Sequence, residues 1–158
     1  MILFAYGTRP EFIKVDPLIQ EFKRNDIPYK TLFTGQHYDL VKENNIDYKL
    51  KIKNKSKNRL SNIVCSIVEQ FERLPLEDIT SVLVQGDTTS AMAVAMAAFN
   101  NKIPVLHLEA GLRTYDSFNP YPEEFNRKTI AALATFHLCP TLSAVENLKK
   151  EGITKNVF

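Results

Sequence analysis

Two acidic residues stand directly after apolar segments that are typical of buried strands. Asp87 follows Gly86 at the end of the segment 81–85, and Glu109 follows the segment 105–108. Ligands bind at the carboxyl ends of the strands of an open parallel sheet, so we expect both carboxylates there. Mutual repulsion or partial burial would raise the pKa of one of them towards neutrality. Such a pair is suited to general acid–base chemistry.

A third carboxylate, Glu123, follows a proline at the predicted start of a helix, where the helix dipole favours an acid. Purely structural roles for these three acids stay open. Asp87 and Glu109 are equally suited to capping helices or lying in loops. Glu123 also has the i, i+4 spacing to Arg127 of a surface ion pair worth about 0.3–0.5 kcal/mol. Glu124 points about 100° away from Glu123 on the helix, so we expect its substitution to matter far less.

The polar cluster Gly7-Thr8-Arg9 follows the first predicted strand, 2–6. Its glycine lets the backbone approach a ligand, and the N-terminus of the next helix favours an anion. The sequence contains no GxGxxG and no GxxxxGKS/T, so neither a dinucleotide site nor a P-loop is predicted. His107-x-Glu109 superficially matches a zinc deaminase, but the paired cysteines of that site are lacking. His107 and His137 lie in apolar segments and are expected to be core residues.

Composition excludes several classes of protein. The 158 residues include 20 Lys and Arg against 18 Asp and Glu, a net charge of +2, which argues against nucleic-acid binding as the dominant role. Two cysteines and three dispersed histidines exclude a disulfide scaffold and a zinc finger. No apolar run reaches the roughly 18–20 residues of a membrane span, and the start lacks the basic region of a signal peptide. We expect one cytoplasmic globular domain.

The elements that must position these side chains alternate between strands and helices. The predicted strands are 2–6, 29–34, 81–85, 105–108 and 136–139. The predicted helices are 11–24, 60–73, 88–99, 122–134 and 141–150. Thr8 is a plausible cap for the first helix, and another strand begins at Val157-Phe158. Continuous apolar strands alternating with helices indicate an α/β fold, with a parallel sheet covered on both faces.

The stretch 39–58 is polar and rich in lysine, and we expect a helix followed by an exposed loop or edge segment. Five of its lysines alternate with residues that include Leu50 and Ile52: Lys49, Lys51, Lys53, Lys55 and Lys57. Lysines in this pattern protect a sheet edge from pairing. Because interleaved aromatic residues are missing, contact with nucleic acid is the less favoured alternative.

Five short motifs occur in order along the chain. They are Gly7-Thr8-Arg9-Pro10-Glu11 with Lys14, Thr34-Gly35-Gln36-His37, Gln85-Gly86-Asp87-Thr88-Thr89, His107-Leu108-Glu109-Ala110-Gly111-Leu112-Arg113-Thr114, and Pro122-Glu123-Glu124-x-Asn126-Arg127. Together they closely resemble the non-hydrolysing UDP-N-acetylglucosamine 2-epimerases, over essentially the whole chain. The resemblance implies that residues 1–158 are the N-terminal Rossmann-like domain of a two-domain, glycosyltransferase-B-type fold. The C-terminal domain, which carries most UDP-binding residues and a catalytic histidine, is absent from this chain.

The resemblance also implies an activity: conversion of UDP-GlcNAc to UDP-ManNAc, a precursor of surface polysaccharides, without metal or nicotinamide. The implied path is anti elimination of UDP to 2-acetamidoglucal, followed by re-addition of UDP to the opposite face. The C2 proton becomes acidic only as the C1–O bond breaks, and carboxylates suit both tasks. The acid–base candidates are Asp87, Glu109 and Glu123. Arg9 and Lys14 would neutralise the diphosphate, and Arg113, the third residue expected at the substrate site, would lower the pKa of a neighbouring carboxylate.

Further expectations concern the whole protein. The isolated chain should lack epimerase activity, because one wall of a cleft cannot shield the reaction from water. The surface that faces the second domain should be apolar and should promote homo-oligomers. Allosterically activated members have a glutamine three places beyond Gln36, and Asp39 stands there, which argues against such activation. The alternatives are a hydrolysing relative that releases ManNAc and UDP, and a non-catalytic half-domain that binds a partner chain or a nucleotide sugar.

Overall fold

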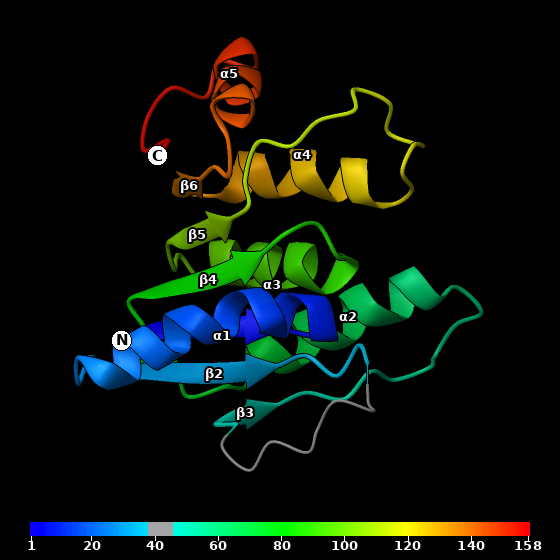
Figure 1. Ribbon diagram of the computed structural model, residues 1–158. Coiled ribbons are helices and arrows are strands. Elements are labelled where there is room, and N and C mark those ends of the chain that lie inside the picture. Colours follow the sequence, from blue (N-terminus) through cyan, green and yellow to red (C-terminus); the bar gives the residue numbers. More distant parts are fainter. Residues whose placement is uncertain (38–45) are drawn as a thin grey trace.

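The structure is a computed structural model that describes residues 1–37 and 46–158 (Figure 1). Its strands are β1 (Ile2–Tyr6), β2 (Tyr29–Phe33), β3 (Tyr48–Lys49), β4 (Ser81–Gln85), β5 (Val105–Leu108) and β6 (Phe136–Leu138). Its helices are α1 (Arg9–Arg24), α2 (Arg59–Phe71), α3 (Thr89–Asn100), α4 (Glu123–Leu133) and α5 (Leu142–Lys150). The paired strands are parallel, in the order β3-β2-β1-β4-β5-β6. This order, which reverses at β1 and β4, is that of a doubly wound, Rossmann-like sheet.

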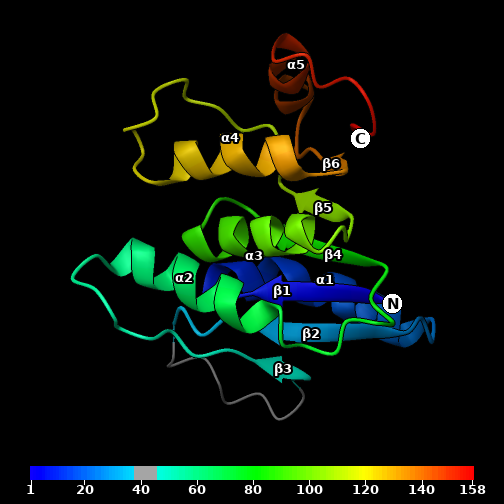
Figure 2. The same cartoon turned by 180° about the vertical axis from the view of Figure 1, so that it is seen from behind.

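Helices cover both faces of the sheet (Figures 1 and 2). On one face α1 packs on side chains such as Phe4 and Leu83. On the other, α2 and α3 cover the alternate residues, such as Leu3 and Val82, and α4 packs against α3 and β5. The prediction of a parallel sheet covered on both faces is confirmed.

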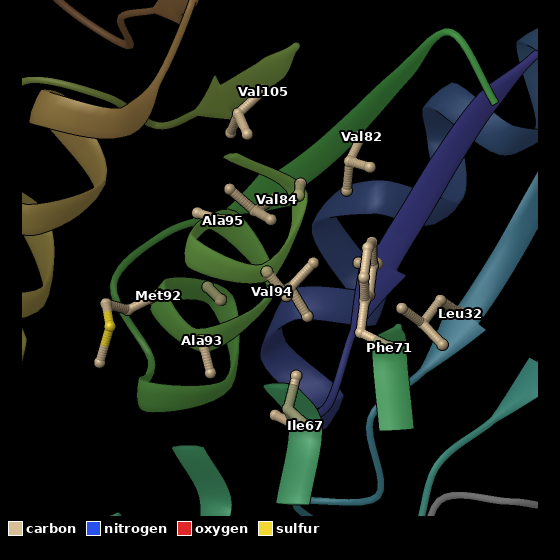
Figure 3. Packing of buried hydrophobic residues seen from close by; sticks show 14 of the residues in the cluster. Leu32, Ile67, Phe71, Val82, Val84, Met92, Ala93, Val94, Ala95 and Val105 are labelled. Carbon is tan, nitrogen blue, oxygen red and sulfur yellow. The ribbon is translucent and has the colours of Figure 1, made fainter. Parts of the chain in front are cut away.

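The alanine-rich helix α3 lies at the centre of the larger core cluster (Figure 3). Ala93, Val94 and Ala95 are fully buried, and side chains of α2, including Ile67 and Phe71, are fully buried beside them. Small side chains let the α3 backbone approach the sheet closely. Each large apolar side chain buried here contributes roughly 1.5–3 kcal/mol to folding. The strands β4 and β5, whose carboxyl ends carry the candidate site residues, are therefore supported by a closely packed core.

Only part of the stretch 39–58 lies within the described residues. Residues 38–45, Asp39 among them, lie outside the described residues. From 46 to 58 the described chain forms no helix, but the short edge strand β3 and an extended segment. The extended segment is held along α2: the Lys53 N–H donates to Ser66 Oγ at 2.8 Å, and Leu50 is buried beneath it. The expected edge segment is confirmed, whereas the helix expected at the start of the stretch falls mainly on residues outside the described ones.

The segment Val157-Phe158, where the sequence predicts the start of a strand, lies along β6. Val157 forms a parallel bridge with His137, and the Cys139 N–H donates to the Phe158 carbonyl at 2.7 Å. The other helix and strand boundaries agree with the predictions to within two residues. No helix in the described part of the chain is long and apolar enough to cross a membrane.

Candidate active site

The first helix begins with a closed network of hydrogen bonds. Thr8 caps α1, and Glu11, only 2% exposed, accepts hydrogen bonds at Oε2 from the N–H groups of Gly7 and Thr8 at 2.8 and 2.7 Å. Its Oε1 accepts from the Thr88 hydroxyl at 2.7 Å, which ties α1 to the start of α3. Burial raises the pKa of Glu11, although these hydrogen bonds oppose the shift. The chain's own carboxylate thus occupies the helix N-terminus where the sequence predicts an anion site, and Arg9 beside it is exposed.

Glu109 stands at the end of β5 in a left-handed backbone conformation, with φ of 68°. This conformation costs a non-glycine residue about 1 kcal/mol or more. The Lys14 Nζ atom contacts Glu109 Oε2 at 2.5 Å, and the side-chain amide of Gln85 donates to the same oxygen. Lys14 comes from α1 and Gln85 from β4. Three elements therefore converge on one carboxylate oxygen.

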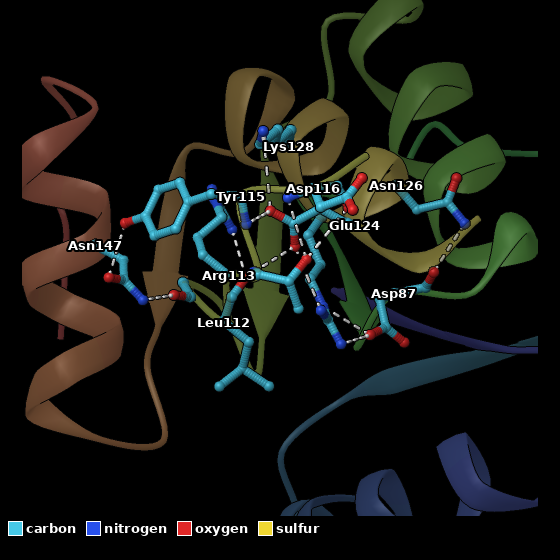
Figure 4. A network of polar contacts seen from close by, with 12 residues as sticks. Asp87, Leu112, Arg113, Tyr115, Asp116, Glu124, Asn126, Lys128 and Asn147 are labelled. Carbon is cyan, nitrogen blue, oxygen red and sulfur yellow. Dashed lines mark hydrogen bonds and ion pairs between the residues drawn. The ribbon is translucent and has the colours of Figure 1, made fainter. Parts of the chain in front are cut away.

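Asp87 follows the Gly86 turn after β4, and Arg127 binds its side chain (Figure 4). The Arg127 Nε and Nη2 atoms lie 2.8 and 2.6 Å from Asp87 Oδ2. Burial raises the pKa of Asp87, Arg127 lowers it, and the charges of Glu123 and Glu109 raise it further. The structure thus brings together the three carboxylates that the sequence singles out.

Glu123 and Glu124, the first two residues of α4, have different surroundings. Glu123 Oε2 is buried and has no hydrogen-bond partner within the described residues. The Glu124 side chain is fully buried, and its two oxygens accept from the N–H groups of Thr114 and Tyr115 at 3.0 and 2.9 Å. Burial opposes its charge, but these bonds and Arg127 hold the pKa of Glu124 below its ordinary value. Arg127 pairs with Asp87 and Glu124, so the alternative of a surface pair between Glu123 and Arg127 is not formed among the described residues.

A cleft of about 540 Å³ opens at the carboxyl ends of β4, β5 and β6. Its lining residues are Lys14, Gln85, Leu108, Glu109, Leu138, Cys139, Pro140 and Phe158. One wall is therefore polar and charged, and the rest is mostly apolar. Asp87 and Glu123 are not among the lining residues but couple electrostatically to each other. A polar molecule with an apolar portion fits this combination.

The exposed apolar residues lie mainly in two places. Leu142, 82% exposed, and Phe158, which lines the cleft and is 66% exposed, belong to the C-terminal part. Phe118, Tyr121 and Phe125, on α4 and the loop before it, are also exposed. That a second domain or a second copy of the chain covers either surface stays a prediction.

Arg113 is placed differently from the other predicted site residues. Its guanidinium donates from Nε and Nη2 to the two oxygens of Glu151 at 2.7 Å each, and its side chain is fully buried. It also donates to the Leu112 carbonyl at 2.8 Å. Arg113 thus anchors the end of α5 to the loop after β5. A direct role at the substrate stays a prediction.

Both histidines expected in the core are buried, side by side in β5 and β6. His107 Nε2 donates to the Gly86 carbonyl at 2.7 Å, and burial lowers the pKa of His107 to about 4. Both are core residues as predicted, but the Nδ1 atoms of His107 and His137 are buried without a partner in the part of the chain described. Across residues 1–37 and 46–158, no group of three or more His, Cys, Asp or Glu is placed to hold a metal ion.

Sequence reasoning missed three contributors to the site: the Gln85 amide, the buried anchor Glu124, and Arg127 as the partner of Asp87. The signal for Gln85 was its place at the end of an apolar strand. For Arg127 the i, i+4 spacing offered only a local pair with Glu123. Its pairing with Asp87 joins distant segments of the chain, which no local spacing specifies.

Comparisons with known proteins identify relatives of this chain. The family model described as UDP-N-acetylglucosamine 2-epimerase matches residues 20–158. A protein of that name from Campylobacter jejuni is 44% identical over 98% of this chain. The crystal structure of UDP-GlcNAc 2-epimerase from Neisseria meningitidis, bound to UDP-GlcNAc, has a TM-score of 0.90 and 40% identity over 99% of this chain.

The chain spans less than half of each of these proteins: 42% of the Campylobacter relative and 44% of the Neisseria structure. The same holds for the relative from Salmonella borreze, 42% identical over 99% of this chain and 44% of its own length. The family match nevertheless covers most of the chain and all three carboxylates. The chain therefore belongs to the UDP-N-acetylglucosamine 2-epimerase family.

Proposed function

We propose that this chain is the N-terminal half of an enzyme that interconverts UDP-GlcNAc and UDP-ManNAc. The observation that carries the proposal is the convergence of Asp87, Glu109 and Glu123 at the carboxyl edge of the sheet, beside a cleft with Lys14 in its wall. The Neisseria relative binds UDP-GlcNAc, and the proposed ligand of this cleft is the same nucleotide sugar.

In the proposed reaction, a carboxylate takes the proton from C2 as the C1–O bond breaks and UDP leaves. The electron pair of the C2–H bond forms the C1–C2 double bond, so the intermediate is 2-acetamidoglucal. UDP then re-forms the C1–O bond, and a second acid delivers a proton to the other face of C2. Glu123 has a buried oxygen without a partner among the described residues, and Asp87 has a raised pKa. Carboxyl groups in these states are suited to exchanging protons.

The basic residues suit the departing diphosphate. Lys14 Nζ already lies in the cleft, 2.5 Å from Glu109, where it would meet both the carboxylate and the leaving group. Arg9 is exposed at the start of α1 and would reach the diphosphate from the solvent side. Arg113 would act from a distance, because its positive charge lowers the pKa of Glu124 behind the site.

The other half of the enzyme would close the cleft. The relatives are more than twice as long as this chain, and we propose that a second, UDP-binding domain faces the carboxyl edge and excludes water. The proposed location is the cytoplasm, where the product would be a precursor of surface polysaccharides. The apolar residues exposed on the chain are proposed to support docking of that domain and homo-oligomer formation.

The test uses a fusion of residues 1–158 to the remaining C-terminal part of the Campylobacter relative. We expect this fusion protein to convert UDP-GlcNAc into UDP-ManNAc, as followed by NMR of the sugar, and the 158-residue chain alone to do nothing. Release of free ManNAc would instead indicate a hydrolysing enzyme. A folded fusion protein that binds UDP but turns over no UDP-GlcNAc would contradict the proposal.

A further inference from the structure

Arg127 lies between two carboxylates that belong to different parts of the chain, Asp87 and Glu124. Both carboxylates are labelled in Figure 4. Its Nε and Nη2 atoms contact Asp87 Oδ2 at 2.8 and 2.6 Å, and its Nη1 donates to Glu124 Oε2 at 3.4 Å. The Arg127 side chain is 15% exposed, and the Asp87 side chain is 26% exposed. A planar guanidinium that is held on two sides keeps one orientation, which an ammonium group could not reproduce.

The far side of this bridge is anchored to the backbone. Glu124 accepts hydrogen bonds from the N–H groups of Thr114 and Tyr115, which belong to the loop after β5. Asn126, in the same helix as Arg127, donates from Nδ2 to the main-chain carbonyl of Asp87 at 2.8 Å. Helix α4 therefore holds both the backbone and the side chain of Asp87.

Arg127, which bridges Asp87 and Glu124, also offsets the repulsion between neighbouring carboxylates. Asp87, Glu109 and Glu123 bring three carboxylates together, and like charges disfavour each other's ionised form. Lys14 is placed on Glu109, at 2.5 Å. Arg127 is the cation that contacts Asp87, so the ionisation of Asp87 depends on it more than on any other contact that the structure shows.

We propose that Arg127 is the positioning residue of Asp87, and that Asn126 supports it by fixing the Asp87 backbone. Arg127 orients the carboxylate and keeps it ionised beside Glu109 and Glu123, and it does so without touching the sugar. The proposal rests on the proposed function only for the task that it gives to Asp87. The contacts and their effect on the ionisation of Asp87 do not depend on that function.

The test is a ¹³C NMR titration of the Asp87 carboxyl group in the 158-residue chain, in wild type, Arg127→Gln and Arg127→Lys. We expect the pKa of Asp87 to rise by about 1–3 in Arg127→Gln, the range for loss of an adjacent opposite charge, and by less in Arg127→Lys. The matched control is Arg73→Gln, which removes an exposed i, i+4 pair with Glu69 and should leave the titration of Asp87 unchanged.

An Asp87 that titrates identically in Arg127→Gln and wild type would overturn the proposal. If Arg127→Gln does not fold, Arg127→Lys decides: a raised pKa of Asp87 supports the proposal, and an unchanged one overturns it. In the fusion protein, Arg127→Lys should lower kcat more than it changes KM and should move the acid limb of the pH profile upward. An inactive wild-type fusion would count against the proposed function alone, because the titration needs no turnover.

Discussion

The starts of α1 and α4 differ although both place acidic residues at the carboxyl edge of the sheet. At α1, Thr8 caps the helix and both oxygens of Glu11 accept hydrogen bonds. At α4 the first residue is preceded by Pro122, which forms no side-chain capping bond. Glu124 is anchored there, but Glu123 keeps a buried oxygen without a partner in the described part of the chain. Glu11 thus stabilises the start of α1 through its hydrogen bonds, whereas Glu123 keeps an oxygen that no hydrogen bond in the described residues occupies.

This distinction has an energetic basis. A buried polar atom without a partner costs about 1–3 kcal/mol, so folds rarely keep one without a use. Among the three carboxylates such costs occur together: Glu123 has a buried oxygen without a partner in the described residues, Glu109 has a left-handed backbone and Asp87 has a raised pKa. Burial also raises the pKa of Glu11 at α1, but the hydrogen bonds of the capping box hold that carboxylate and stabilise the helix. Unfavourable features that occur together in this way are expected at functional sites.

The largest expected effect comes from the neighbouring glutamates of α4. In the fusion protein, Glu123→Gln should lower kcat by about 10²–10⁴, the usual contribution of a positioned acid or base, with little change in the free energy of unfolding. Glu124→Gln should instead cost about 2 kcal/mol of stability, because an amide cannot accept both backbone N–H groups. Enzyme kinetics and urea unfolding of both variants check this. A Glu124→Gln protein that is fully folded and as inactive as Glu123→Gln would contradict the assignment.

Lowering the pH should change the contributions of two buried groups to the free energy of unfolding with opposite signs: His107 in β5 and Glu11 in α1. The folded-state pKa of His107 is about 4, below the ordinary 6.5, so the unfolded chain binds the proton first and stability is lost as the pH falls from about 6.5 to about 4. The loss attributable to His107 is about 3 kcal/mol. Glu11 has a raised pKa in the folded state, so its contribution becomes more favourable as the pH falls.

The measurement is urea unfolding of wild type and His107→Gln between pH 7 and pH 4. Glutamine keeps a donor for the Gly86 carbonyl but does not titrate, so the variant should lose about 3 kcal/mol less over this range. Equal losses in the two proteins, or an imidazole of His107 that titrates near 6.5 by NMR, would refute the assignment.

A smaller contrast is expected between two glycines. A Cβ atom at Gly7, beside the α1 network, would lie 2.0 Å from Thr34 Oγ1 and 2.7 Å from Ser90 Oγ. Gly7→Ala should therefore cost about 1–3 kcal/mol through overpacking. A Cβ atom at Gly86 would meet only Glu109 Oε2, at 3.9 Å, so Gly86→Ala should cost about 1 kcal/mol for its φ of +69°. Thermal unfolding of both variants ranks them, and a larger loss in Gly86→Ala would reverse the comparison.

Local features of the sequence predicted much of the fold. Thr8 capped the expected helix, the strands 81–85 and 105–108 were correct, and the alanine-rich helix packs closely on the sheet. These features depend on periodicity and capping, which neighbouring residues determine. The edge strand in the lysine-rich stretch was anticipated for the same reason.

The contacts of the site were harder to predict. Lys14 and Glu109 are 95 residues apart in the sequence, and Arg127 and Asp87 are 40 apart. Which cation meets which carboxylate depends on the order of the strands, which no local pattern specifies. Arg113 shows the same limit: no local pattern predicts that its guanidinium binds Glu151, 38 residues away in the sequence.

The central claim is that the carboxylates around Asp87, Glu109 and Glu123 exchange the proton at C2 of the sugar. The most direct measurement is deuterium at C2 after the fusion protein has acted on UDP-GlcNAc in deuterated water, read by NMR and mass spectrometry of the recovered UDP-sugars. We expect one deuterium at C2 in UDP-ManNAc, and we expect this incorporation to be lost or strongly slowed in Asp87→Asn, Glu109→Gln and Glu123→Gln. Conversion to UDP-ManNAc with the original hydrogen still at C2 would contradict the central claim.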